Sequence, residues 1–182
     1  MRQYVEQAVR GDQEAFDALA RLVGGRCMGI AYGILRDADM AEDAVQSALI
    51  KAWRELPTLR DRDRFEPWLH RILTNECYEQ ARSRRRWTAY VRVLPVARWT
   101  DQAGFINVED RDQLERGLRR LTLEQRAVLV FHHYLGLSNA DIADELGIPL
   151  GTVKSRLHHA TSALRACLEA DARTSNAEER LA

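Results

Sequence analysis

The stretch from Ser138 to Leu157, SNADIADELGIPLGTVKSRL, limits what this chain can fold into more than any other. Ser138 and Asp141 have the spacing of a capping box, which predicts the start of a short helix. Gly147 lies where that helix must end and where φ can become positive. Pro149 suits the first position of a second helix, since its missing N–H costs nothing there. The stretch therefore predicts two short helices around a tight turn, a helix-turn-helix.

The second helix of this pair carries polar and cationic side chains on the face opposite its apolar residues. They are Thr152, Lys154, Ser155, Arg156, His158 and His159. No acidic residue occurs between Glu145 and Glu169, so this face suits the major groove of duplex DNA. Many helical hairpins have a glycine turn and bind no DNA, and the acid-free helix is what favours the DNA interpretation.

Charge and cysteine content narrow the class of protein. The formal net charge of the 182 residues is zero, so total charge alone predicts no polyanion partner. Cys27, Cys77 and Cys167 are far apart and odd in number, which predicts buried thiols and no disulfide framework. The sequence has no signal-peptide pattern and no apolar run near about 18 residues. We expect a soluble, cytoplasmic protein without membrane insertion.

The N-terminal half contains three helical patterns. Apolar residues from Phe16 to Ile34 recur with a period of 3.6, and a break is expected at Gly24-Gly25. A second helix is predicted over 39–53, with a capping box at its start. Its polar face carries Asp43, Gln46, Ser47, Ile50 and Lys51. An ordinary surface helix explains the polar residues but not the isolated apolar residue, which indicates a protein docking face.

The third pattern begins at Phe65, has Pro67 in its first turn, and ends in the run RSRRRW. Its exposed side is predicted to carry His70, Arg71, Thr74, Asn75 and Tyr78. A run of charges is usually a solvated face. Aromatic residues interleaved with arginines also suit a groove for single-stranded nucleic acid. The run alone does not separate these two interpretations.

Few β-branched residues alternate with polar ones, so the predicted fold class is all-α. The expected organisation is two small helical domains, 1–86 and 111–170, joined by a flexible linker over 87–110 and followed by a polar tail over 171–182. In the second domain, Thr122 and Gln125 again have capping-box spacing.

Both halves together resemble the bacterial extracytoplasmic-function (group 4) RNA polymerase sigma factors of the sigma-70 family. AEDAVQSALIKAW, followed by RFEPWLHRILTNECYEQARSRRR, is similar to sigma region 2. LRRLTLEQRAVLVFHHYLGLSNADIADELGIPLGTVKSRLHHATSAL is similar to region 4. No region 3 lies between them, which is the pattern of this group. The resemblance implies a promoter-specificity subunit that recognises −35 and −10 elements and assists promoter melting.

The resemblance also implies which residues act. Polymerase contacts fall on Asp43, Gln46, Ser47, Ile50 and Lys51. Contacts to the −10 element fall on Arg64, Phe65, Trp68, Arg71, Asn75, Tyr78, Arg82, Arg84, Arg85 and Arg86. Contacts to the −35 element fall on Thr152, Lys154, Ser155, Arg156, His158 and His159. The segment 58–64 matches the family's loop that holds a base flipped from the −10 strand.

The partners implied are core RNA polymerase (its β′ clamp and β flap), promoter DNA in duplex and single-stranded form, and an anti-sigma factor. The sequence has no catalytic, metal-binding or cofactor-binding motif, so neither an enzyme nor a cofactor is expected. The alternative is a free-standing helix-turn-helix regulator whose N-terminal domain senses a signal or dimerises. That alternative explains the arginine-rich, aromatic helix poorly.

Overall fold

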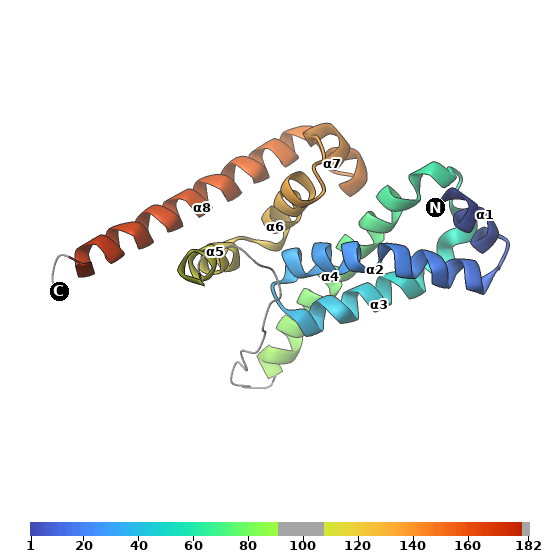
Figure 1. Cartoon of the computed structure of the whole chain (residues 1–182), viewed down its shortest axis with the longest axis horizontal. Coiled ribbons are helices and arrows are strands. Elements are labelled where there is room, and N and C mark those ends of the chain that lie inside the picture. The colour runs from blue at the N-terminus through green and yellow to red at the C-terminus, as the bar shows by residue number, and fades with distance from the viewer. Residues whose placement is uncertain (91–107, 180–182) are drawn as a thin grey trace.

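The computed structural model describes residues 1–90 and 108–179, with side chains over 1–86 and 112–170. Within these ranges the chain forms helices and no strand, which confirms the all-α prediction (Figure 1). The long helices are α1 (Arg2–Val9), α2 (Gln13–Leu35), α3 (Ala38–Glu55), α4 (Phe65–Tyr90), α5 (Val108–Arg120), α6 (Leu123–Leu129), α7 (Asn139–Leu146) and α8 (Leu150–Glu179). Three short turns lie between them, η1 (Leu56–Thr58), η2 (Arg62–Arg64) and the π-helical η3 (Val130–Tyr134). Most of the expected linker lies outside the described residues.

α2 is the central helix of the N-terminal bundle, and α1, α3 and α4 pack around it. Its side chains Leu19, Ile30 and Ile34 are completely buried. The predicted break at Gly24-Gly25 is wrong, because the helix continues through both glycines. Two glycines weaken a helix by about 2 kcal/mol together, whereas one fully buried leucine or isoleucine contributes about 1.5–3 kcal/mol. Burial of the flanking residues therefore keeps α2 intact.

By length and composition alone, α2 is also apolar enough to cross a membrane, with a mean hydropathy of 1.2. This differs from the sequence prediction of no apolar run near about 18 residues, because the polar residues within α2 are few and scattered. The apolar side of α2 packs in the core against its three neighbours. A core helix of a bundle passes the same length and composition test.

α3 begins earlier than its sequence pattern predicts. The carboxylate of Asp37 accepts a hydrogen bond from the amide of Met40 at 3.0 Å, so Asp37 is the N-cap. The predicted capping box of Asp39 and Glu42 is therefore wrong, and Asp39 lies in the first turn, where its charge suits the helix dipole. The buried face of α3 is built largely from alanines, namely Ala41, Ala44, Ala48 and Ala52. These small side chains bring α3 close to α2 and α4.

The C-terminal helices form the predicted helix-turn-helix. Ser138 and Asp141 form a complete capping box at the start of α7. Gly147 ends α7 in the left-handed conformation, with φ of 65°. Val153 and Ala160 then anchor the inner face of α8 and are completely buried. The second expected capping box, Thr122 with Gln125, is also present at the start of α6. α8 runs to Glu179, past the point where a polar tail was expected to begin.

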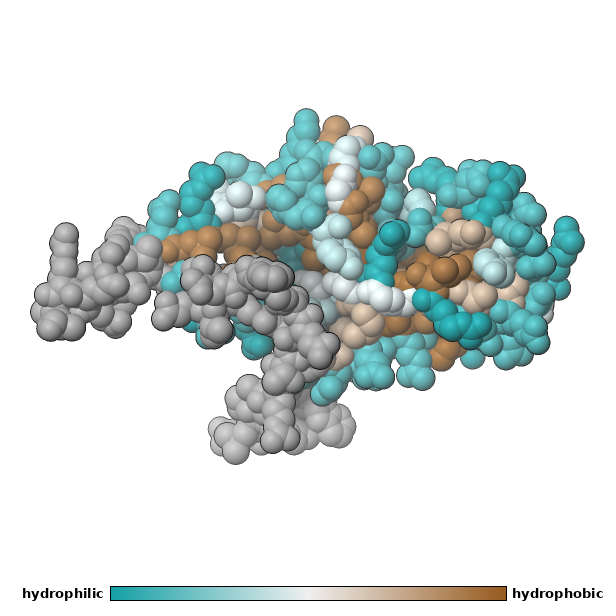
Figure 2. All heavy atoms as spheres, in the orientation of Figure 1, coloured by the Kyte–Doolittle hydropathy of each residue, from teal (hydrophilic) through white to brown (hydrophobic). Residues whose placement is uncertain are grey.

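The two helical groups share one core. A single apolar cluster extends from α1 to α8 and includes Phe131 and Ile142 from the C-terminal group. α6 and η3 pack against α2, and α7 packs against α4. Figure 2 shows a mostly hydrophilic surface on the visible face, with apolar side chains showing among the polar ones. The C-terminal group therefore lies directly on the N-terminal bundle over a long seam.

Candidate nucleic-acid interface

The outer face of α8 presents the residues predicted to read duplex DNA. Lys154, Ser155, His158 and His159 are exposed, whereas Thr152 and Arg156 are half-buried. These side chains project from the helix that follows the glycine turn. The hydroxyl of Ser155 donates to the carbonyl of Thr152 at 3.0 Å, so this hydroxyl already has a partner within the helix. The face is cationic and is backed by the buried side chains of Val153 and Ala160.

The residues predicted for the exposed side of α4 differ in their exposure to solvent. Arg71 and Asn75 are exposed and Tyr78 is half-buried. His70 and Thr74 are buried, at 7% and 2% exposure, so the prediction that they face solvent is wrong. A tertiary contact causes this burial, because α7 packs against this side of α4 and gives the helix a second buried face.

The two aromatic residues at the start of α4 differ in exposure. Phe65 is 2% exposed and belongs to the core, whereas Trp68 is half-buried. Their ring centroids are 6.0 Å apart, at a tilt of 43°. The Phe65 ring thus supports Trp68 from the protein interior. Of the pair, Trp68 has the surface on which a base could stack. Arg64, just before the helix, is exposed.

The arginine run at the end of α4 is solvent-facing and partly ion-paired. Arg82, Arg84, Arg85 and Arg86 are all exposed. Arg82 pairs with Glu79 at 2.8 Å, and Arg84 pairs with Asp37 at the start of α3. Exposed pairs of this kind contribute about 1 kcal/mol or less each, so the arginines can exchange these partners for phosphates.

The polar face of α3 is exposed to solvent. Asp43, Gln46 and Lys51 are exposed and Ser47 is half-buried. Ile50 is 48% exposed, which confirms that an apolar residue interrupts this face. A shallow hollow of about 420 Å³ lies beside Ile50, between α3 and Glu76 of α4. Lys51 spans it by pairing with Glu76 at 3.2 Å.

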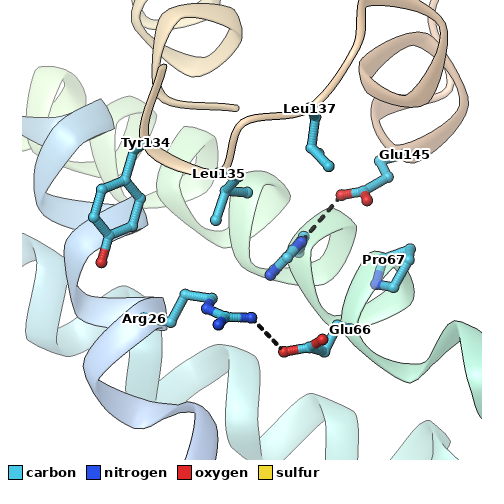
Figure 3. A pocket seen from close by; sticks show the side chains of 8 residues that line it. Arg26, Glu66, Pro67, Tyr134, Leu135, Leu137 and Glu145 are labelled. Atoms are coloured by element: carbon cyan, nitrogen blue, oxygen red, sulfur yellow. Dashed lines mark hydrogen bonds and ion pairs between the residues drawn. The ribbon is translucent and has the colours of Figure 1, made fainter. Parts of the chain in front are cut away.

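A buried acid–base pair at the seam is the feature that sequence reasoning missed. Nδ1 of His70 lies 3.0 Å from Oε2 of Glu145, and both side chains are 8% exposed (Figure 3). His70 also contacts the ring of Phe131 edge-on. The pair borders a cavity of about 450 Å³, which Arg26 and Glu66 close at the other side with a second ion pair of 2.7 Å. No sequence signal indicated this pair, because His70 lies on the side of α4 that the helical period predicts to be exposed.

Two side chains with shifted pKa values lie at the same seam. Burial raises the pKa of Tyr78 to about 12, Glu124 adds to the rise, and Arg156 opposes it. Burial lowers the pKa of Arg126 to about 10, with the cation of Arg36 adding to the effect. The side chains of the C-terminal group therefore lie close to those of α4 and α2.

The part of the chain that the structure describes contains no cluster of side chains suited to bind a metal ion. Within it, no three histidine, cysteine, aspartate or glutamate side chains gather in a way that could hold an ion. The adjacent histidines of α8, His158 and His159, have ring centroids 5.7 Å apart.

Comparison with known proteins gives a consistent result in both halves. A family model described as sigma-70 region 2 matches residues 16–87, and one described as sigma-70 region 4 matches residues 111–164. The RNA polymerase sigma-H factor of Pseudomonas aeruginosa is 31% identical, over 92% of this chain and 93% of the relative. The ECF RNA polymerase sigma factor SigM of Mycobacterium tuberculosis is 38% identical, over 86% of this chain and 78% of the relative.

Solved structures give the same comparison in three dimensions. The sigma factor RpoE of Bartonella quintana, in complex with the anti-sigma factor NepR, matches with a TM-score of 0.70 and 31% identity, covering 86% of this chain and 98% of the other. CnrH, in complex with the cytosolic domain of CnrY, matches with a TM-score of 0.67 and 27% identity, covering 93% of this chain and 97% of the other.

Proposed function

Since the chain belongs to the extracytoplasmic-function sigma factors of the sigma-70 family, it is a promoter-specificity subunit of bacterial RNA polymerase, and we propose that three of its surfaces divide the steps of initiation. The observation that supports this division is the placement of three dissimilar exposed faces on three helices, α3, α4 and α8. Family membership also removes the free-standing regulator from consideration.

The polymerase-docking surface is the polar face of α3. Asp43, Gln46 and Lys51 supply charge and hydrogen bonds, and Ser47 lies beside them. Ile50 supplies the apolar contact, because an exposed isoleucine gains free energy when a partner covers it. We assign this face to the β′ clamp of the polymerase and the C-terminal helical group to the β flap.

The −10 surface is the outer side of α4 and the turn before it. Trp68 offers its ring to an unstacked base, with Phe65 packed behind it. Arg71, Asn75 and Tyr78 follow along the strand, and Arg64 and the arginines at 82 and 84–86 hold backbone phosphates. Stacking returns about 1–3 kcal/mol per base, which offsets a base extraction that costs a few kcal/mol.

The −35 surface is the outer face of α8. Lys154, Ser155, Arg156, His158 and His159 face the major groove, and Thr152 meets a phosphate near the helix N-terminus, where the helix dipole favours anions. The protein acts by binding rather than by catalysis, and it acts in the cytoplasm, where promoter DNA and polymerase are found. Its regulator is an anti-sigma factor, as in the RpoE–NepR complex of its structural relative.

The test is run-off transcription with core polymerase from a promoter library. One good contact to a base edge is worth about 1–3 kcal/mol, so Lys154→Ala is expected to lower transcription about 5- to 150-fold. The loss should vanish on templates whose −35 element has been replaced. Arg165→Ala is the matched control, because it removes an exposed cation from the same helix outside the proposed surface.

The −10 surface is tested in the same assay. Asn75→Ala should lower transcription from the intact promoter but cause no further loss where the −10 element is replaced. Equal losses for Lys154→Ala on every template, or transcription that needs no DNA element at all, would contradict the assignment of these faces.

A further inference from the structure

α1 lies at one end of the N-terminal bundle, beside the connection between α3 and α4 (Figure 1). This connection contains segment 58–64, which is similar to the family's loop that holds a base flipped from the −10 strand. The match to sigma-70 region 2 begins at residue 16, so α1 precedes the matched residues. The proposed surfaces on α3, α4 and α8 leave α1 without a role.

The inner side of α1 is anchored in the core. Val5 and Ala8 are 1% and 2% exposed, and α1 contacts both short turns of the connection, η1 and η2. Leu56 and Leu59, at the start of the connection, belong to the same apolar cluster. A loop is held mainly by the elements that it packs against, so the anchored α1 restricts the positions open to segment 58–64.

Arg2 joins α1 to the middle of η2. Its Nη1 donates to both carboxylate oxygens of Asp63, at 3.0 and 3.2 Å. Its Nε donates to Glu6, one turn further along α1, at 3.2 Å, and this second bond directs the guanidinium towards the loop. Because two carboxylates already engage this cation, it is better suited to hold the loop than to bind a DNA phosphate.

Charges alternate along segment 60–64, with arginines at 60, 62 and 64 and aspartates at 61 and 63. The protein itself engages both aspartates, since Asp61 accepts the amide of Asp63 at 3.0 Å and Asp63 accepts the guanidinium of Arg2. The negative charge of this segment is therefore partly offset before a strand of phosphates approaches it.

Arg62, in the same turn, carries a buried donor. Its Nη1 has no hydrogen-bond partner within the described parts of the chain. A buried donor without an acceptor costs free energy, so the turn keeps this arrangement only because its surroundings hold it there. α1 and α4 are the helices that contact η2, and bases carry acceptor atoms on their edges that suit such a donor.

We infer that α1 is a buttress of segment 58–64, and that Arg2, acting through Asp63, is a positioning residue that holds this segment in the shape that receives the flipped base. The inference rests on the proposed −10 surface and adds to it a helix that the family match does not include. A loop that already has its binding shape loses less conformational entropy when the base enters. The base that fits gains most, because the hydrogen bonds that recognise it require a fixed geometry.

Arg2→Ala tests this and should leave the fold intact, because the Arg2 side chain is 66% exposed. Arg10→Ala is the matched control, since it removes an exposed cation at the other end of α1. Asp63→Ala and the double variant complete a mutant cycle. If Arg2 acts through Asp63, the double variant should behave like Asp63→Ala alone. Circular dichroism confirms that each variant is folded.

Run-off transcription with core polymerase is measured on templates that carry each of the four bases at each −10 position. Arg2→Ala should reduce the preference for the best base at one position by up to about fivefold, the size expected for one exposed ion pair. Preferences at the other positions and the response to the −35 element should not change, and Arg10→Ala should match the wild type. A uniform loss on every template that persists in the Asp63→Ala background would make Arg2 a phosphate contact and overturn the inference.

Hydrogen exchange of the free chain measures the loop directly. Arg2→Ala should speed exchange of the amides of Asp63 and Arg64, which both donate to Asp61, and should leave the amides of α3 protected. Unchanged exchange, or faster exchange with no change in base preference, would overturn the inference. Failure of the proposed function would look different, because the wild type itself would then show no base preference at any −10 position, and the inference would fall with it.

Discussion

Replacing Gly24 and Gly25 together with alanine should stabilise the protein. Both glycines lie inside α2, and a Cβ at either position would have no heavy atom within 4 Å. Alanine in a helix interior is favoured over glycine by about 0.8–1.0 kcal/mol, mainly because the unfolded chain loses less entropy on folding. With no clash to subtract, the double variant should raise the free energy of unfolding by about 1.6–2 kcal/mol.

The assay is thermal unfolding followed by circular dichroism at 222 nm. A domain of this size gains about 2–4 °C per kcal/mol, so Tm should rise by about 3–8 °C. Gly136→Ala is the matched control of opposite sign. A Cβ there also meets nothing within 4 Å, but its φ of 70° disfavours alanine, so Tm should fall. An unchanged or lower Tm for the double variant would refute the reasoning and show that α2 needs both glycines.

Three further predictions concern caps, core and pH. Ser138→Ala removes the cap of α7 and should lower the free energy of unfolding by about 1 kcal/mol in urea titrations, with Ser138→Asp retaining most of it. Phe131→Ala should cost about 3–5 kcal/mol, because that ring is completely buried where the two helical groups meet; a loss below 1 kcal/mol would contradict a shared core. Burial raises the pKa of Cys27 to about 11 and of Cys77 to about 12, from an ordinary 9.0. Because these thiols stay protonated in the folded state, their contribution to the free energy of unfolding is fully present below pH 9 and is lost as the pH rises through 11 and 12. At pH 8 both thiols should resist Ellman's reagent until urea unfolds the chain. Rapid reaction of the folded protein would disprove this.

Local chemistry was the part of the fold that the sequence predicted well. The capping box of Ser138 and Asp141, and the glycine that ends α7, depend on residues within one turn of each other. Such interactions are visible in sequence because their geometry is fixed by spacing. The start of α3 shows the limit of this reasoning, since Asp37 and Asp39 both suit a cap and only the path of the preceding chain selects Asp37.

Contacts between distant residues were the part that the sequence did not reveal. A helical period identifies one buried face, but α4 has two, because α7 covers the side that carries His70 and Thr74. The partner of His70 is Glu145, 75 residues away. No rule of spacing connects them. The same reasoning applies to Phe65, whose aromatic type predicted a base-stacking role and whose environment is the core.

Gly147 links the motif and the seam in a way that affects how mutations are interpreted. Its left-handed φ shapes the turn of the helix-turn-helix, and its missing side chain makes room for Arg71. Any substitution there is expected to strain the left-handed turn and to displace the guanidinium of Arg71 at the same time. A saturation screen at Gly147 scored by stability would thus record the sum of the two effects. Separating the two requires pairing each Gly147 variant with Arg71→Ala and measuring the free energy of unfolding, because Arg71→Ala empties the space without touching the turn.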